Sequence, residues 1–365
     1  MDVEAQQPTK APATRHKCSA CYKQFTKKEH LVEHMKISYH SPHQPQCGVC
    51  RKHCKSFESL REHLTGKLAK TSCSTVYSQL GCNLCLKVFE SPTSLSNHKG
   101  ICCLSAPGSL ATKMLNGREV RNDSQLLNIK YTGEGTRAVA IDCEMVGGGS
   151  DGSVDLCARV CLVDEDENVI LCTYVQPQSP ITNYRHEITG LTAEHLKDAV
   201  PVKQVQNKIL EILYTREFVG RQQPADTMAR LLVGHDLKHD LDCLRMDYPR
   251  HLLRDTAKYR PLMKTNLVSH SLKYLIRTYL GYDIQKGIHD PYEDCVSVMR
   301  LYKRLCAQDH QMDGNGTEIF DYSFDLWKHE ELQKMTPDEL YKISKLDYIC
   351  WCSDSKPAKQ PCHSS

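Results

Sequence analysis

The stretch Arg137-Ala-Val-Ala-Ile-Asp-Cys-Glu-Met-Val146 carries the signal that the rest of the chain completes. Its β-forming residues alternate with small ones and lead into the glycine run 147–149, which predicts a buried strand that stops at a loop. Asp142 and Glu144 are two residues apart, so their side chains point to the same face of the sheet. Two carboxylates on one face repel each other and resist desolvation, and a bound cation would relieve both problems. Because 25% of the residues are charged, such a pair also arises by chance, and its significance depends on further acids downstream.

The charge of the chain is divided unevenly between its two parts. The 365 residues are enough for two or more folded units. Residues 1–135 hold 19 Lys and Arg against 10 Asp and Glu, a net charge of +9, and residues 136–365 hold 28 against 34, a net charge of −6. A basic first part ahead of an acidic one suggests an anionic partner, with nucleic acid as the first candidate.

Cysteine usage indicates a reducing compartment. Residues 1–12 are polar and contain no apolar core of a signal peptide, and no apolar run approaches the roughly 18 residues of a membrane helix. We therefore expect the 20 cysteines to be zinc ligands and reduced core thiols rather than disulfides, and the protein to be in the nucleus, possibly the nucleolus, or in the cytoplasm. Residues 1–15 have the composition of a disordered tail.

Residues 16–103 contain three cysteine–histidine units with zinc-finger spacing. In the first, residues 16–40, a hairpin would present two thiolates and a short helix two imidazoles, and tetrahedral Zn²⁺ would close a fold too small to be stable without it. Phe25 and Leu31 occupy the positions of the small core of such a ββα finger. The predicted ligands follow the pattern Cys18-x2-Cys21-x12-His34-x5-His40.

The second unit, residues 47–73, departs from this pattern. It begins Cys47-x2-Cys50-x12-His63 and has Cys54 where an aromatic core residue is expected. Cys73 is the nearest fourth ligand, with Cys54 as a competitor. A degenerate finger with weak or no zinc binding is the alternative.

The third unit, residues 82–103, again replaces the last histidine by cysteine. It reads Cys82-x2-Cys85-x12-His98 and is followed by the adjacent thiols Cys102 and Cys103. Either thiol can serve as the fourth ligand, so the spacing predicts a Cys-Cys-His-Cys site and leaves that choice open.

The fingers lack the residues that usually read DNA bases. No base-facing position carries the arginine that most often recognises guanine, and the connectors 41–46 and 74–81 are irregular, whereas fingers that follow one groove need a constant short spacer. We favour shape or backbone binding, RNA included, and keep protein contact as the alternative. The base-facing positions are Lys27, His30 and Glu33 in the first finger and Ser91, Ser94 and Asn97 in the third.

From residue 136 onward the pattern is that of a mixed α/β fold. Residues 104–135 show no sustained periodicity and are interpreted as a linker. Strand, strand, strand, helix, strand, helix is the order of a mixed sheet with flanking helices. After the opening strand, β-rich runs at 158–163 and 169–175 are joined by an acidic hairpin loop. One helix is expected to begin at Thr192 and a second to span 202–213. Two further strands, at 231–233 and 252–256, and a helix at 271–280 follow.

Two acids in this region fall on apolar helix faces. Asp236 is placed to cap a helix on which Asp240 shares the apolar stripe of Leu237, Leu241 and Leu244. An unpaired carboxylate in a buried stripe costs several kcal/mol, so a metal partner is expected. Asp242 and Asp247 lie off this face and are interpreted as solvated.

Asp294 repeats this arrangement on a second helix. It shares a face with Val298 and Leu301, and the sequence Asp290-Pro-Tyr-Glu293 predicts a capping box at the start of that helix. His289 lies on the loop just before it. In the extension 307–365 a helix start is expected at Thr336, and the thiols Cys350, Cys352 and Cys362 have no partner set in the sequence, so no metal site is predicted there.

Together, Asp142-x-Glu144, Gly234-His235 with Asp240, and His289-x4-Asp294 resemble the DEDDh 3′→5′ exonucleases, which have an RNase H-like fold. The segments 141–147, 254–256, 271–275 and 293–294 are similar to the RNA exonuclease subgroup that includes the interferon-stimulated exonuclease. The resemblance spans about residues 136–306. Lys238-His239 and Pro291 depart from the usual pattern and could alter how the 3′ nucleotide is held.

The resemblance implies a two-metal phosphodiesterase that releases nucleoside 5′-monophosphates. Carboxylates are hard ligands that suit two Mg²⁺ or Mn²⁺ ions. By resemblance Asp142 bridges both ions, Glu144 and Asp294 hold the ion beside the nucleophile, and Asp240 holds the other. His289, with an unperturbed pKa of about 6.5, would take the proton from the attacking water.

The expected substrate is single-stranded RNA or DNA, and the preference for RNA rests on the resemblance alone. The zinc fingers would aid nucleic-acid binding, and we expect a monomer without a membrane partner. The competing interpretation is a zinc-finger protein that binds nucleic acid or protein and uses an inactive nuclease domain as a scaffold.

Overall fold

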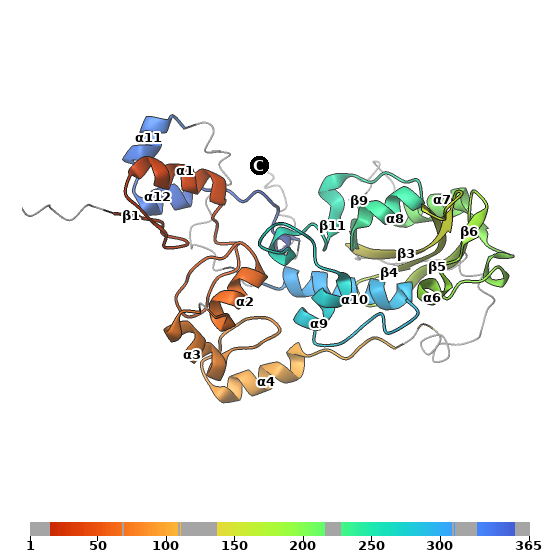
Figure 1. The fold of residues 1–365 in the computed structure, drawn as a ribbon, viewed down its shortest axis with the longest axis horizontal. Helices are drawn as coiled ribbons and strands as arrows, with labels where there is room; N and C mark the ends of the chain where they lie inside the picture. Colours follow the sequence, from red (N-terminus) through yellow and green to blue (C-terminus); the bar gives the residue numbers. More distant parts are fainter. Residues whose placement is uncertain are drawn as a thin grey trace, which may run out of the picture. The chain divides into compact units, whose positions relative to one another are not determined.

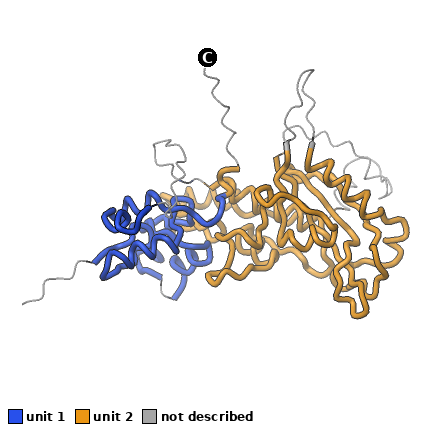
Figure 2. Tube along the Cα trace, turned by 90° about the horizontal axis from the view of Figure 1, so that it is seen from above, with its two compact units in different colours: residues 1–77, 309–350 blue, residues 78–308, 351–365 orange. Residues whose placement is uncertain are grey.

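The computed structural model describes residues 15–67, 69–108, 110, 137–215, 228–308, 310 and 327–354. The chain divides into two compact units (Figure 2): residues 1–77 and 309–350 form unit 1, and residues 78–308 and 351–365 form unit 2. The expected disordered tail, most of the expected linker and Cys362 lie outside the described residues. The domain boundaries expected from the sequence remain predictions. Among the described helices, none combines the length and the apolar character needed to cross a membrane.

Unit 2 is built on a seven-stranded mixed sheet (Figure 1). The strand order is β11-β10-β3-β4-β5-β7, with β6 paired to β3; β11, β10 and β3 run parallel, and β3, β4 and β5 run antiparallel. This confirms the predicted mixed α/β class and the hairpin between the second and third strands. The strands are β3 Ala138–Gly148, β4 Val154–Val163, β5 Val169–Gln176, β6 Ile181–Asn183, β7 Val200–Pro201, β10 Leu231–Gly234 and β11 Leu253–Asp255, with a separate pair β8 Tyr214–Thr215 and β9 Met228–Ala229.

Helices cover both faces of this sheet. Val139 and Ile141 belong to the apolar core that α7 and α8 complete, so the alternate residues of β3, Asp142 and Glu144, point to the other face, against which α10 packs. The helices of unit 2 are α4 Pro92–Cys102, α6 His186–Thr189, α7 Val202–Leu213, α8 Leu237–Cys243, α9 Leu272–Tyr279 and α10 Pro291–Cys306, with 3-10 turns η2 Glu194–Leu196, η3 Arg250–Leu252, η4 Arg260–Leu262 and η6 Trp351–Ser353.

Three local expectations are met only in part. The helix expected at Thr192 is a single 3-10 turn, because β7 begins only a few residues later, at Val200. Asp290 caps α10 by accepting from the Tyr292 backbone N–H at 3.1 Å, but Glu293 accepts from the Gln285 backbone N–H instead of closing a capping box. Asp236 stands at the N-cap of α8 with φ 57°, but its side chain accepts no capping bond from the helix backbone and lies 3.3 Å from His239 Nε2 instead.

The third finger belongs to unit 2 and is attached to its last long helix. The backbone N–H of Leu104 donates to the Leu280 carbonyl at 3.1 Å, and Arg300 of α10 donates to the Ser105 carbonyl at 2.8 Å. Arg304, one turn further along α10, donates to the Cys102 carbonyl at the end of α4. Helix α3, Thr71–Leu80, precedes this finger and crosses the boundary between the units.

Unit 1 combines the first two fingers with the C-terminal segment. The first finger consists of β1 His16–Lys17, β2 Gln24–Phe25 and α1 Lys28–Ser38, and the second contributes α2 Phe57–Thr65. The helices α11 His329–Lys334 and α12 Pro337–Lys342 place Leu332 and Leu340 in one apolar core with Leu31 and Met35 of α1. Thr336 begins α12 with a complete capping box, as the sequence predicts for a helix start.

Candidate functional site

The acidic pair Asp142 and Glu144 lies on β3, in the middle of the sheet. Asp142 stands opposite Cys161 of β4 and Glu144 opposite Arg159, and the register shifts between Glu144 and Met145. A bulge at this place changes the direction in which the following side chains point, and bulges are common next to active sites. Glu144 is 5% exposed, and Asp142 is partly exposed.

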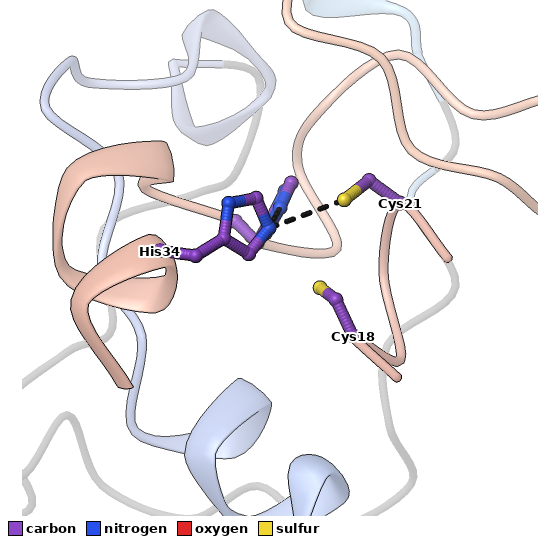
Figure 3. Close-up of side chains that lie close together, drawn as sticks. Cys18, Cys21 and His34 are labelled. Carbon is purple, nitrogen blue, oxygen red and sulfur yellow. Dashed lines mark hydrogen bonds between the residues drawn. The ribbon is translucent and has the colours of Figure 1, made fainter. Parts of the chain in front are cut away.

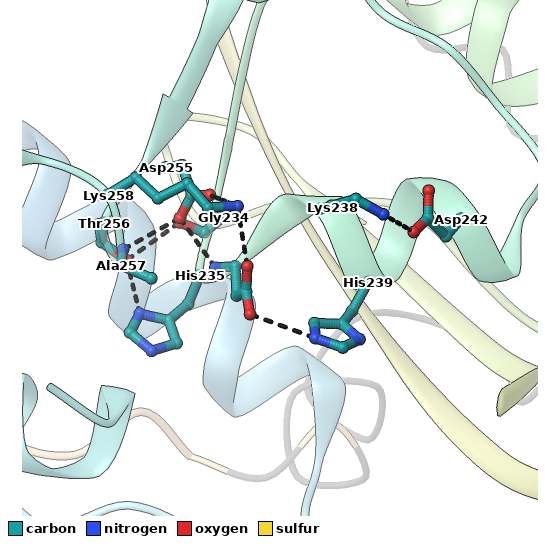
Figure 4. Close-up of polar contacts among 10 residues, drawn as sticks. Gly234, His235, Lys238, His239, Asp242, Asp255, Thr256, Ala257 and Lys258 are labelled. Atoms are coloured by element: carbon teal, nitrogen blue, oxygen red, sulfur yellow. Dashed lines mark hydrogen bonds and ion pairs between the residues drawn. The ribbon is translucent and has the colours of Figure 1, made fainter. Parts of the chain in front are cut away.

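The turn between β10 and α8, which positions Asp240, is fixed by hydrogen bonds to the end of β11. The backbone N–H groups of Asp236 and Ala257 donate to Asp255 Oδ1 at 2.8 and 3.0 Å (Figure 4). Thr256 donates to the Gly234 carbonyl at 3.0 Å, and Lys258 Nζ lies 2.9 Å from Asp236 Oδ1. These bonds tie the end of β11 to the turn that starts α8.

The position of Asp240 on α8 follows from that turn. Asp240 is buried, 4% exposed, and Leu237 and Leu241 of the same face lie in the apolar core. Asp242 on the same helix is exposed and pairs with Lys238. The interpretation of Asp240 as the buried acid and Asp242 as the solvated one is therefore confirmed.

Asp294, in the first turn of α10, has one satisfied and one unsatisfied oxygen. Oδ2 accepts from Gln285 Nε2 at 2.8 Å, while Oδ1 is buried and has no hydrogen-bond partner among the described residues. A buried carboxylate oxygen without a partner is unfavourable, and such a group calls for an explanation such as a bound ion. A divalent cation fits this place.

Electrostatic repulsion between the acids is strongest at Asp142, whose pKa the other three acids raise. Burial raises the pKa of Asp142 well above its usual range, and repulsion from Asp294, Asp240 and Glu144 adds to this effect. Burial also raises the pKa of Glu144 to about 8, with repulsion from Asp294 in addition and opposition from Arg159. The pKa of Asp294 is raised to about 7, chiefly by burial.

The donor set of this acidic cluster fits hard divalent cations. Four carboxylates of high pKa are costly when ionised, and a cation would stabilise the ionised forms. Oxygen ligands suit Mg²⁺ or Mn²⁺ better than zinc. The acidic cluster, defined by Asp142, Glu144, Asp240 and Asp294, is therefore the candidate centre for these ions.

His289 lies on the loop before α10, as expected. Its backbone N–H donates to the Ile188 carbonyl at 2.7 Å, which anchors the loop to α6. Burial lowers the pKa of His289, nearby Lys273 lowers it further, and Glu293 opposes the shift. The imidazole is therefore neutral, and able to accept a proton, at neutral pH.

Sequence reasoning missed two residues that support the acids. Gln285 orients Asp294 through the bond described above, and Arg159 faces Glu144 across the β3–β4 ladder and lies 3.8 Å from Asp290. Neither residue has a motif of its own in the sequence. Pairing the strand that carries Glu144 with the following β-rich run could have predicted the contact of Arg159. The contact of Gln285 depends on the conformation of the loop before α10, which the sequence does not reveal.

The thiols and imidazoles of the fingers form three separate clusters. In each, the candidate ligand atoms lie within 4.8 Å of one another: Cys18, Cys21, His34 and His40; Cys47, Cys50, His63 and Cys73; Cys82, Cys85, His98 and Cys102. Figure 3 shows Cys18, Cys21 and His34 converging from the hairpin and α1. Cys21 Sγ is 3.2 Å from His34 Nε2, which in turn is 3.2 Å from His40 Nε2.

These distances are those of ligands around one small ion. Tetrahedral zinc with Zn–N of about 2.0 Å and Zn–S of about 2.3 Å holds two nitrogens roughly 3.3 Å apart and two sulfurs roughly 3.8 Å apart. Cys82 Sγ and Cys102 Sγ are 3.8 Å apart. The three clusters thus fit zinc.

The structure also separates the alternative fourth ligands of the second and third fingers. Cys73 lies in the second cluster, while Cys54 is buried outside it. Cys102 lies in the third cluster, while Cys103 is exposed and outside it. Phe89 and Leu95 form the small core of the third finger, with Leu95 buried.

Comparison with known proteins gives matches to the sheet-containing part of the chain. Residues 139–302 match the model of the RNase T family, described as exonuclease. The chain is 35% identical to RNA exonuclease 4 of Saccharomyces cerevisiae over 180 residues, which cover 49% of this chain and 57% of that protein. It is 35% identical to RNA exonuclease 4 of Homo sapiens over 195 residues, which cover 53% of this chain and 43% of that protein.

The matched part is about half of this chain, and it spans about half the length of the curated relatives. Among solved structures, the Neurospora crassa Pan2 catalytic unit is similar with a TM-score of 0.40 and 22% identity, over 48% of this chain and 28% of that one. That similarity is too weak to bear on function. The acidic cluster lies entirely within the segment that matches the exonuclease family.

Proposed function

We propose that the protein is a metal-dependent 3′→5′ exonuclease of the DEDDh type that acts on single-stranded RNA. The observation that carries this proposal is the convergence of four buried or partly buried acids, from β3, α8 and α10, inside the segment that matches the exonuclease family. The relatives named RNA exonuclease 4 support RNA as the substrate.

The proposed role of the acidic cluster is to hold two divalent cations. Asp142, whose pKa the other three acids raise, would contribute to holding both ions; by the resemblance, Glu144 and Asp294 would hold one ion with it and Asp240 the other. Bound Mg²⁺ or Mn²⁺ would supply an activated water and stabilise the departing oxygen of the phosphodiester. Gln285 fixes one oxygen of Asp294, and the other, buried without a hydrogen-bond partner among the described residues, is available to an ion.

The proposed role of His289 is that of general base. Its depressed pKa keeps the ring neutral at physiological pH, so a ring nitrogen can accept the proton from the attacking water. The loop that carries His289 is fixed by its bond to Ile188 and by the cap of α10. Proton transfer of this kind contributes about 10²–10⁴ to the rate in other enzymes.

The fingers are proposed to bind zinc and to supply affinity for the RNA backbone. The first 135 residues have a net charge of +9, as described above, and positive charge attracts phosphates irrespective of base sequence. The acidic part of the chain would repel phosphates, so a tethered basic part raises the local concentration of substrate.

The test is degradation of matched single strands by the full-length protein. With Mg²⁺, 5′-labelled RNA with a free 3′ end should shorten stepwise from that end and release nucleoside 5′-monophosphates. RNA with a blocked 3′ end and the Asp142→Ala variant should both be inert. Faster degradation of the matched DNA would show a DNA-directed enzyme, and absence of activity on either substrate would favour the inactive scaffold.

A further inference from the structure

Besides the finger clusters, unit 1 contains a further group of metal-ligating side chains. It is formed by His43 in the connector between the first two fingers and by His310 and Cys350, which stand at the two ends of the C-terminal segment of this unit. Their candidate ligand atoms lie within 4.8 Å of one another. His43 precedes His310 by 267 residues, so no spacing motif in the sequence reveals this group.

The distances within this group resemble those of the finger clusters. His43 Nδ1 is 3.1 Å from His310 Nδ1, and His310 Nδ1 is 3.8 Å from Cys350 Sγ. A tetrahedral zinc ion would hold two nitrogens roughly 3.3 Å apart and a nitrogen and a sulfur roughly 3.6 Å apart. In the first finger the nitrogen–nitrogen separation is 3.2 Å.

The approach of a third ligand to the two rings favours a shared ion over a simple hydrogen bond between them. The two imidazole planes meet at 72° with their centroids 4.7 Å apart, so the rings do not stack, and their Nδ1 atoms face each other. A hydrogen bond between the rings would need only one donor and one acceptor nitrogen. Cys350, which is 8% exposed, converges on the same Nδ1 of His310, as a third ligand of one ion does.

We propose that His43, His310 and Cys350 bind a structural zinc ion in addition to those of the fingers. Imidazole and thiolate donors select zinc over Mg²⁺ or Ca²⁺. The chain supplies a fourth ligand in Cys352, because the sequence Cys350-Trp-Cys352 puts a second thiol two residues away, at most about 7 Å along the backbone. This reverses the expectation that no metal site lies near Cys350: the partners come from distant parts of the chain.

The proposed ion would hold both ends of the C-terminal segment to the connector that carries His43. His310 and Cys350 are 40 residues apart, and between them α11 and α12 pack on α1 of the first finger. A metal that joins both ends of this segment to His43 closes a long loop, which restricts the unfolded chain and couples zinc binding to the folding of unit 1. This role is independent of nuclease activity.

The experiment measures zinc per chain in the full-length protein by elemental analysis after gel filtration. His310→Asn and Cys350→Ser should each contain one zinc equivalent less than the wild type. His329→Asn, which changes an exposed histidine of α11 in the same unit, should contain the wild-type amount. Equal zinc content in the wild type and His310→Asn would overturn the proposal.

A ligand exchange keeps the test decisive if the asparagine variant folds poorly. Because thiolate also binds tetrahedral zinc, His310→Cys should restore the full zinc content and the thermal stability of the wild type. Zinc content and thermal stability as low in His310→Cys as in His310→Asn would mean that the loss reflects misfolding rather than a missing ligand, and would overturn the proposal. Cys352→Ser should lose the same equivalent as Cys350→Ser, and full retention would exclude Cys352 as the fourth ligand.

Discussion

The finger clusters and the acidic cluster are both candidate metal sites, but the chain builds them over different distances. Each finger cluster comes from one short stretch, such as residues 18–40, whereas the acidic cluster joins residues 142, 240 and 294 from one strand and two helices. A short stretch can close around an ion with little help from the rest of the fold. The acids meet only when the sheet is complete.

The two kinds of cluster also differ in how the fold shifts the pKa values of their ligand side chains. In the first finger, the hydrogen bond between Cys18 and Cys21 lowers the pKa of the Cys21 thiol and raises the pKa of the Cys18 thiol, so one of the two thiolates forms readily. In the sheet, burial and mutual repulsion raise the pKa values of the acids. Mutation, pH and metal should therefore affect the two regions in separable ways.

Removal of a single acid should give the largest difference between the two regions, because it should abolish nuclease activity and leave zinc binding intact. Asp240→Ala or Asp294→Ala should abolish exonuclease activity, a loss of at least about 10³-fold, because each removes a ligand of the proposed two-metal centre. Zinc content should remain that of the wild type. The matched control is Asp242→Ala, which removes the exposed acid of α8 and should leave activity unchanged. Full activity of either buried-acid variant would contradict the two-metal proposal.

The next effect concerns the base. His289→Ala should reduce turnover by about 10²–10⁴ while binding of single-stranded RNA stays near normal. Since the pKa of His289 is lowered, the wild-type rate should hold down to pH values below about 6.5 and fall only where the ring is protonated; the variant should lose this acid limb. His251→Ala, at an exposed histidine, is the control. A loss of affinity equal to the loss of rate would indicate substrate positioning instead.

A smaller effect is expected from the basic surface of the fingers. Replacing exposed Lys23, Lys27 and Lys55 by Gln should raise KM for RNA by about 3–10-fold and flatten its salt dependence, because fewer phosphate contacts release fewer counterions. The rate at saturating RNA should not change. Substitution of Lys197 and Lys203 in unit 2 controls for net charge. An unchanged KM on naked RNA would favour fingers that bind a protein partner.

The smallest effect is on stability in buffer free of Mg²⁺ and of chelators, where finger zinc is kept. The pKa values of Glu144 and Asp294 in the folded state, about 8 and about 7, exceed their ordinary values of 4.5 and 3.8. Ionisation therefore opposes folding, and the contribution of these two acids to the free energy of unfolding should fall as pH rises from about 4 to about 8. Added Mg²⁺ should reverse the fall.

A single substitution isolates this contribution. Glu144→Gln should raise the melting temperature at pH 8 by a few degrees, on the order of 1 kcal/mol, and should have no effect near pH 4, where the glutamic acid is already protonated. Glu211→Gln, on the exposed side of α7, is the control. A higher melting temperature at pH 4 as well would point to packing rather than to charge.

Much of the sheet region could be predicted from the sequence because its signals are periodic. Helix α7 has the predicted bounds, 202–213, since its apolar residues recur at helical spacing through Ile209 and Leu213. The burial of Asp240 followed from its place among leucines. The missed details, such as Glu293 bonding to Gln285 instead of closing a capping box, depend on a loop that no periodicity describes.

By itself the sequence determined the α/β class, the order of the longer strands and helices, and the candidate ligands whose spacing lies within one element or one finger, because these depend on local periodicity and chain geometry. Only the tertiary structure selected Cys73 and Cys102, placed Gln285 and Arg159 beside the acids, and brought His43 to His310 and Cys350. Such contacts join residues far apart in the chain. Their partners are chosen by which surfaces pack together, and packing depends on all the elements at once.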